Sequence, residues 1–97
     1  MTTAATRFAE LEAEARAQGF DEVLERRWAP GTMTDVHEHP FALRAVVVQG
    51  EMRLTTGGET HHLQPGDEFA LAQGVPHAEG YGPEGAIYWV ARRTAKP

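Results

Sequence analysis

Histidine is the residue type in this chain with the most chemical potential, and its spacing indicates a metal site. Five histidines occur, and cysteine is absent. His37 and His39 are separated by one residue in a segment that we predict to be a strand, Thr32–Glu38. Side chains two residues apart on a strand point to the same face, so both imidazoles could reach one ion. Imidazole is a ligand for zinc, copper, iron and nickel.

The adjacent histidines His61 and His62 favour a different role. Neighbouring side chains on a strand point to opposite faces, so this pair cannot chelate one ion from a single strand. We expect both to be ordinary strand-edge residues, with an inward position for one of them as the alternative.

The composition excludes several classes of function. The 97 residues allow one domain. The chain has no apolar run of about 18 residues, so we predict no membrane span. The net charge of −5 disfavours nucleic acid and anionic membranes as partners. The arginine pairs Arg26-Arg27 and Arg92-Arg93 are expected to be solvated strand-end charges. The absence of cysteine and of a secretory signal pattern favours a cytoplasmic location.

The pattern along the chain predicts one helix followed by strands. Phe8, Leu11 and Ala15 form an apolar stripe in a helix predicted from about Thr3 to Gln18. After Asp21, short runs rich in β-branched and aromatic residues alternate with Gly, Pro and Asp turns. Such a series implies antiparallel sheets in a sandwich or barrel. Besides Thr32–Glu38, the predicted strands are Glu22–Ala29, Leu43–Gln49, Glu51–Thr56, Thr60–Leu63, Glu68–Ala72, Pro76–Glu79 and Ala86–Arg92, with a break at Gly80-Tyr81-Gly82-Pro83.

Alternation along these strands also predicts which aromatic side chains face inward. We expect Phe69 and one of Tyr88 and Trp89 to pack inside, where they would line a pocket or fill the core. Trp28 is expected in the core or on a dimer surface.

Two groups of residues have the spacing of known sequence motifs. Gly31 is followed, after five residues, by His37-x-His39, and Gly50 closes the next strand. Further on come Gly66-Asp67, then Gly74, and then Val75-Pro76-His77. From Gly31 to His77 the chain resembles the cupin superfamily, in which a glycine and His-x-His motif is followed by a glycine-aspartate and histidine motif.

The resemblance implies a fold and a set of ligands. We expect an all-β cupin double-stranded β-helix, or jelly-roll barrel, over residues 21–97, with residues 1–20 as a short helix packed on it. The matching histidines of cupins coordinate a metal inside the barrel, so His37, His39 and His77 are expected to hold one divalent ion. Iron, manganese, zinc and nickel are all candidates.

The chain departs from the cupin pattern at the position of a frequent fourth ligand. Leu43 stands where a glutamate is usual, and its neighbour Arg44 has no lone pair to offer a metal. A three-histidine site is one consequence. The alternative is that Glu79, on the face of His77, supplies the missing carboxylate. Asp35 could orient an imidazole. The alternative for both Glu79 and Asp35 is an ordinary carboxylate at the rim or in a turn.

The resemblance also suggests an activity. Small cupins include three-histidine iron dioxygenases, so the first hypothesis is Fe(II)-dependent oxygenation of a small molecule. Glu79 and Tyr81 are the candidate catalytic side chains. The alternatives are a non-catalytic cupin that binds or senses a small molecule or metal, and a sugar isomerase or epimerase, which would need further acid–base groups facing the pocket. We also expect a homodimer, in which Glu22–Trp28 could add to a neighbouring sheet.

Overall fold

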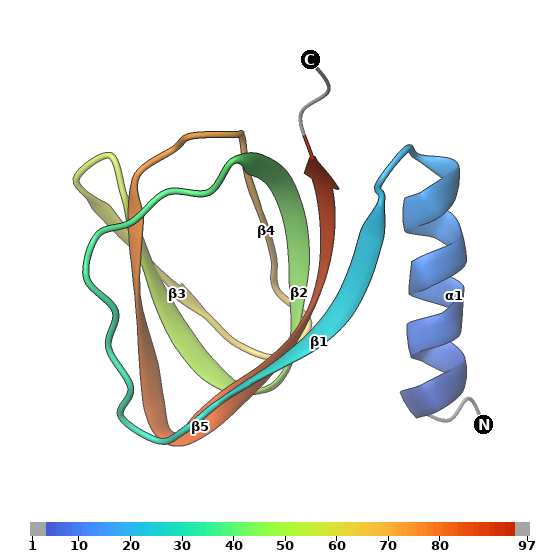
Figure 1. Cartoon of the computed structure of the whole chain (residues 1–97). Coiled ribbons are helices and arrows are strands. Elements are labelled where there is room, and N and C mark those ends of the chain that lie inside the picture. The colour runs from blue at the N-terminus through green and yellow to red at the C-terminus, as the bar shows by residue number, and fades with distance from the viewer. Residues whose placement is uncertain (1–3, 95–97) are drawn as a thin grey trace.

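The computed structural model describes residues 4–94 and shows one helix followed by a curled antiparallel sheet (Figure 1). The sheet order is β1-β5-β2-β3, and β4 also pairs with β2. The elements are α1 (Ala4–Ala17), β1 (Glu22–Trp28), β2 (Phe41–Thr56), β3 (Glu59–Leu63), β4 (Glu68–Leu71) and β5 (His77–Thr94). The predicted β-barrel with a short N-terminal helix is therefore confirmed.

Two long strands form most of the barrel wall. β2 and β5 pair along almost their whole lengths, from Phe41 opposite Thr94 to Thr56 opposite His77. The prediction of two strands on either side of Gly50 was wrong, because β2 continues through this residue. The predicted break at Gly80–Pro83 was also wrong, since these residues lie inside β5. Glycine permits a bend without ending the hydrogen-bonded ladder.

Gly50 and Gly85 show why the bend requires glycine. Both residues have positive φ, +74° in each case. A Cβ on Gly50 would lie 2.2 Å from the Gly85 carbonyl oxygen, and a Cβ on Gly85 would lie 2.3 Å from the Trp28 carbonyl oxygen. The register of β2 against β5 shifts beside Gly50. The close approach of β1, β5 and β2 therefore depends on missing side chains.

Alternation along the strands separates an inner face from an outer face. Tyr88 and Val90 of β5 belong to the buried core inside the barrel, with Val47 and Met52 of β2. Trp89, between them, faces the helix instead, and its ring meets Phe8 edge to face at 5.3 Å. Phe69 packs against the core, as predicted. The sequence left open which of the two β5 aromatics points inward, and the structure selects Tyr88.

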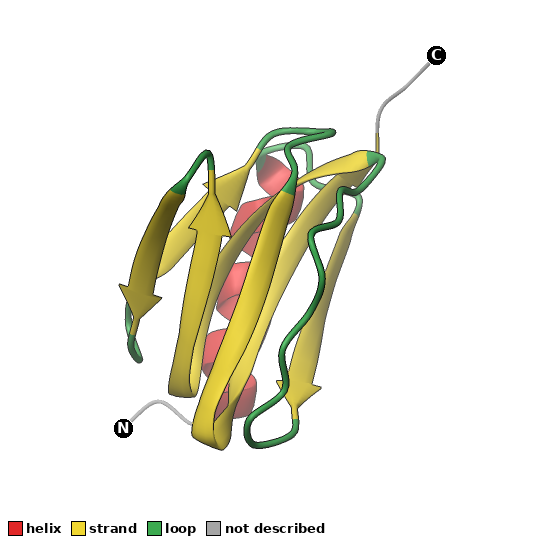
Figure 2. Ribbon diagram, turned by 90° about the vertical axis from the view of Figure 1, so that its left-hand side faces the viewer, coloured by secondary structure: helices red, strands yellow, loops and turns green. Residues whose placement is uncertain are grey.

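Helix α1 lies along the outer face of the sheet, where Figure 2 shows it behind the strands. Arg93 holds the helix end by donating from Nη2 to the Gln18 carbonyl at 2.5 Å and from Nε to the Gly19 carbonyl at 3.3 Å. Cations favour the C-terminal end of a helix dipole. The helix has 14 residues, and no helix in the described part of the chain could span a membrane.

Candidate metal centre

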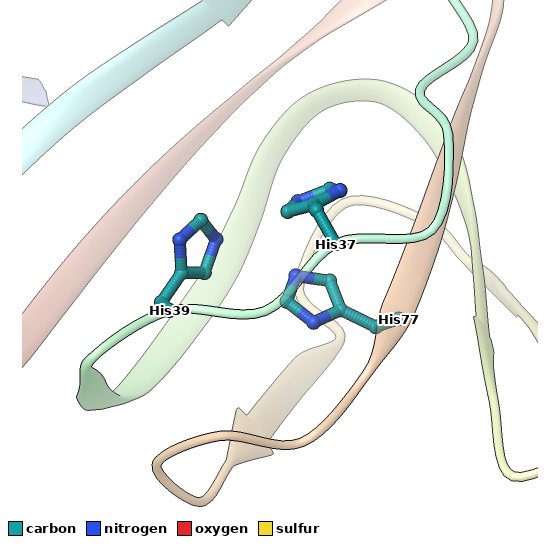
Figure 3. Close-up of side chains that lie close together, drawn as sticks. All are labelled: His37, His39 and His77. Atoms are coloured by element: carbon teal, nitrogen blue, oxygen red, sulfur yellow. The ribbon is translucent and has the colours of Figure 1, made fainter.

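Three of the five histidines come together at one end of the barrel. Nitrogen atoms of His37, His39 and His77 all lie within 4.8 Å of one another. The ring centroids of His37 and His77 are 4.4 Å apart, and that of His39 is 5.0 Å from the first and 5.1 Å from the second. Figure 3 shows two of these side chains on one segment and the third on β5. The three histidines that the motifs singled out are thus neighbours in space.

The segment that carries His37 and His39 is not the regular strand that we predicted over Thr32–Glu38. It touches β5 through isolated bridges, Met33 with Gly80 and His37 with His77. In the second bridge the His37 N–H donates to the His77 carbonyl and the His77 N–H donates to the His37 carbonyl, each at 2.9 Å. These two bonds hold the histidines opposite each other, which replaces the continuous ladder that we expected.

Backbone carbonyls set the tautomer of two imidazoles. His37 Nδ1 lies 2.8 Å from the Asp35 carbonyl oxygen, and His77 Nδ1 lies 2.9 Å from the Val75 carbonyl oxygen. A carbonyl only accepts, so each Nδ1 carries the proton and each Nε2 keeps a free lone pair. We suggested the Asp35 carboxylate as the orienting group. The backbone carbonyl of Asp35 orients the His37 imidazole instead, while the Asp35 side chain is exposed.

The third imidazole is positioned by an aromatic ring. The His39 ring stacks on Phe41, with centroids 4.7 Å apart and an angle of 10° between the planes. Partial burial lowers the pKa of His39, and the nearby His77 and His37 lower it further. A lowered pKa favours the neutral imidazole, which is the form that binds metals.

The residues present fit a divalent metal ion. His77 is 2% exposed, and its Nε2 has no hydrogen-bond partner among the described residues. A buried polar nitrogen without a partner is costly, and a metal ion would satisfy it. Three neutral imidazoles with free lone pairs are a suitable donor set for iron, manganese, zinc or nickel.

A cavity of about 90 Å³ extends from this site into the barrel. His37 and His39 form part of its wall, and Leu43 lies in the same wall. Arg44 points to the other face, where its Nη2 donates to Glu68 Oε1 at 3.0 Å. Leu43, at the position of the usual cupin glutamate, therefore adds an apolar wall beside the histidines. The remaining lining residues are Arg26, Trp28, Phe41, Phe69, Glu79, Tyr88, Val90 and Arg92.

The two candidate catalytic residues lie on the inner side of β5. Glu79 is 8% exposed, lines the cavity and does not belong to the group of three histidines. Its backbone N–H donates to Thr34 Oγ1 at 3.0 Å, which ties it to the segment before His37. Tyr81 is fully buried, and its hydroxyl has no hydrogen-bond partner among the described residues. Burial raises the pKa of Tyr81, as do neighbouring Tyr88 and Glu79.

Two arginines of the cavity were missed by the sequence interpretation. We expected both arginine pairs to be solvated, and Arg26, Arg27 and Arg93 are indeed exposed, whereas Arg92 is half-buried. Arg26 and Arg92 also line the cavity, which we did not predict. Strand alternation was the available signal, because Arg26 is in phase with Trp28 on β1 and Arg92 is in phase with Tyr88 and Val90 on β5.

The remaining histidines lie outside the site, as expected. His61 and His62 are exposed on β3 and each approaches a carboxylate. His61 Nε2 is 3.7 Å from Glu59 Oε2, and His62 Nε2 is 2.9 Å from Glu51 Oε2. Neither histidine lines the cavity beside the three-histidine group.

Comparison with solved structures identifies similar barrels. An RmlC-like cupin from Shewanella frigidimarina is 26% identical, with a TM-score of 0.67, over 76% of this chain and 66% of that chain. A structure from a study of DMSP lyases is 26% identical, with a TM-score of 0.70, over 75% of this chain and 38% of that chain. The Bacillus subtilis oxalate decarboxylase, described with Mn(II) centres, is 25% identical, with a TM-score of 0.65, over 77% of this chain and 21% of that chain.

The chain thus spans about two thirds of the Shewanella protein and much smaller parts of the other two. A search of the curated proteins found no match. The family described as "Cupin domain" matches residues 24–86, which include the three histidines and most of the barrel. The chain therefore belongs to the cupin domain family.

Proposed function

We propose that His37, His39 and His77 bind one divalent metal ion and that the protein uses it in oxygenase-type chemistry on a small molecule. The observation that carries this proposal is the pair of carbonyl-fixed tautomers, which leave the Nε2 atoms of His37 and His77 free beside a cavity. When bound, the ion would supply Lewis acidity and, if it is iron, redox chemistry with dioxygen. Three protein ligands leave room for a chelating substrate.

The protein's own side chains would bind the substrate and exclude water. Phe41, Leu43, Phe69 and Val90 form apolar walls around the histidines. Such walls lower the local dielectric constant and strengthen polar contacts within the cavity. Leu43 removes a negative charge from the site relative to a glutamate, so the proposed ion keeps more of its positive charge for the substrate.

A second candidate is an acid–base reaction, such as an isomerisation or elimination, assisted by the same metal. Glu79 and Tyr88 both line the cavity, and Tyr81 lies next to them inside the barrel. Burial raises the pKa of Tyr88, and the charge of Glu79 raises it further, so the phenol retains its proton at neutral pH. Glu79 could then accept a proton or serve as a fourth ligand, while a tyrosine could donate one.

The metal is tested first, by elemental analysis of protein purified without chelators. We expect about one equivalent of metal in the wild type and almost none in His37→Ala and His39→Ala, whereas His61→Ala should retain it. The oxalate decarboxylase neighbour is described with Mn(II) centres, which supports including manganese among the metals tried in reconstitution. Absence of metal in wild type, even after reconstitution, would overturn the proposal and leave a metal-free binding domain.

The reaction type is tested with an oxygen electrode and a panel of small chelating acids and diols. Oxygen uptake that needs added iron and substrate, and that is lost in His39→Ala, supports the oxygenase. Turnover that proceeds equally without oxygen and is lost in Glu79→Gln supports the acid–base reaction. Metal retention without turnover in either assay supports a binding protein.

We further propose a cytoplasmic homodimer. The observation that favours association is the edge strand β1, which pairs with β5 on one side only within the described sheet. An unpaired edge is a natural place for a second copy to add. Light scattering at micromolar concentration should give twice the chain mass of 10.7 kDa, and a monomer mass would contradict the proposal.

A further inference from the structure

The cavity beside the three histidines has an unusual charge for this protein. The chain as a whole carries a net charge of −5. Among the residues that line the cavity, however, two are arginines, Arg26 and Arg92, and only Glu79 is acidic. A divalent ion on neutral histidines would add further positive charge. A positive cavity in an acidic protein favours an anionic ligand.

The guanidinium group of each arginine lies over an aromatic ring beside the cavity, and each of these rings stacks on a second ring. The Arg92 guanidinium lies 4.9 Å from the centroid of Phe41, and Phe41 stacks on the metal-site residue His39. The Arg26 guanidinium lies 5.0 Å from the centroid of Trp28, and Trp28 stacks on Tyr81 with centroids 4.9 Å apart. Contact with an aromatic face holds a guanidinium in place and leaves its N–H donors available.

The two arginines differ in whether they form an ion pair with a carboxylate. Arg92 forms an ion pair with Glu22, its partner across the β1–β5 ladder. No carboxylate among the described residues forms an ion pair with Arg26. Its neighbour in sequence, Arg27, pairs on the other face of the strand with Glu25 at 2.9 Å. Arg26 is therefore the arginine of the cavity that is free to take an anion.

An unpaired donor lies beside Arg26. The Trp28 indole Nε1 is buried and forms no hydrogen bond of normal geometry among the described residues, and the Tyr88 hydroxyl is a polar neighbour of it. Buried N–H groups almost always find an acceptor. The other tryptophan shows the usual arrangement, since Trp89 Nε1 donates to Glu25 Oε1 at 3.0 Å. The residues that line the cavity thus include a guanidinium without an ion-pair partner and the tryptophan that carries this indole N–H.

We propose that this cavity binds a small carboxylate, with Arg26 and the Trp28 indole N–H as donors to its oxygens and the three-histidine site at its other end. The proposal rests on the proposed function in one respect: it names the class of ligand that shares the cavity with the metal ion. The volume of about 90 Å³ has room for on the order of six waters. A carboxylic acid with a similar number of non-hydrogen atoms, such as lactate, is of the right size.

Lactate and its uncharged counterpart lactamide provide the test, with the indole N–H signals of ¹⁵N-labelled protein as the readout. We expect lactate to shift the Trp28 signal and to leave the Trp89 signal in place, and lactamide to shift neither. A Trp89→Phe variant assigns the two signals. The binding curve gives the dissociation constant.

Substitution of Arg26 should weaken lactate binding. A charged hydrogen bond lost from Arg26→Gln should raise the dissociation constant by about tenfold to a hundredfold, and Arg26→Lys should recover part of the loss. Arg27→Gln is the matched control, because it removes an arginine from the outer face of the same strand. Equal binding of lactate and lactamide, or equal effects of the two glutamine variants, would overturn the proposal.

The titration is run on metal-free protein and on zinc-loaded protein, so that two failures can be told apart. If zinc binds with one equivalent but lactate shifts no indole signal in either form, the carboxylate proposal is wrong and the metal site stands. If lactate binds in the Arg26-dependent way but no metal is taken up, the metal proposal is wrong and the carboxylate site stands.

Discussion

The cavity between α1 and the outer face of the sheet and the cavity beside the three histidines differ in how their polar side chains are paired. The outer cavity, between α1 and the sheet, is the larger, at about 200 Å³ against about 90 Å³ for the inner one. Around the outer cavity, polar groups pair with one another: Arg44 bonds both Glu68 Oε1, at 3.0 Å, and Gln18 Oε1, at 3.3 Å.

The inner face leaves several polar atoms without partners. The buried atoms without a hydrogen bond among the described residues all belong to inner-face side chains: His77 Nε2, Trp28 Nε1 and the Tyr81 hydroxyl. Paired polar groups stabilise a fold, whereas buried unpaired groups raise its energy unless a ligand satisfies them. The difference is the reason why we propose a ligand for the inner cavity and expect the outer cavity to be structural.

The arginine pairs reproduce this contrast at the level of single residues. In each pair, one member faces the inner cavity and the other faces out. Arg93 holds the carbonyls at the end of α1, while Arg92 lies over Phe41 beside the three histidines. A change on the outer face should therefore alter stability, and a change on the inner face should alter binding.

The largest expected effect comes from removing a proposed metal ligand. His77→Ala should weaken metal binding more than about 1,000-fold, equal to roughly 4 kcal/mol, because even outer-shell partners of a ligand contribute 10- to 100-fold. Thermal unfolding with and without added zinc measures the effect, since a bound metal stabilises the folded state. His62→Ala, on the outer surface of β3, should keep the metal-dependent rise in melting temperature. If the two variants behave alike, the inner face has no special part in metal binding.

The next effect concerns the bend that brings the faces into position. Gly50→Ala should lower the free energy of unfolding by about 3 kcal/mol, because the new Cβ adds positive-φ strain to a backbone clash. Urea unfolding measures this change. Gly57→Ala, at φ +58° but with no atom within 4 Å of its Cβ, should cost only about 1 kcal/mol. Equal costs would show that the contact with Gly85 does not control the bend.

A smaller effect is expected where the helix meets the sheet. Phe8→Ala should lower the free energy of unfolding by about 1–2 kcal/mol, because it removes a partly buried ring and its edge-to-face contact with Trp89. Metal content should not change, since Trp89 faces away from the histidines. Loss of metal in this variant would contradict the separation of the two faces.

The smallest effect tests the paired polar groups of the outer cavity. Arg44→Gln removes an exposed ion pair with Glu68 and should change the free energy of unfolding by less than about 1 kcal/mol. Lactate affinity should equal that of the wild type, in contrast to Arg26→Gln. A clear loss of lactate binding would show that the outer cavity also takes part in ligand binding.

The sequence by itself determined the fold class and the three histidines. Period-two alternation placed Phe69 and one β5 aromatic inside, and Gly, Pro and Asp turns marked several strand ends correctly. The spacing of Gly31, His37 and His39, followed by Gly66-Asp67 and His77, was enough to predict which imidazoles would meet. These features are local or depend on fixed spacing, so a linear pattern carries them.

Only the tertiary structure decided how the site is held and what lies around it. The His37 segment is kept in place by backbone bonds to β5, among them the two with His77, which lies 40 positions away along the chain. The tautomers follow from nearby carbonyls rather than from the Asp35 carboxylate. The strands at Gly50 and Gly80–Pro83 continue because their partners lie on distant parts of the chain. Arg26 and the Trp28 indole likewise owe their exposure to the cavity to the β1–β5 register. Such features depend on which distant backbone atoms come within hydrogen-bond reach, and sequence spacing does not specify that distance.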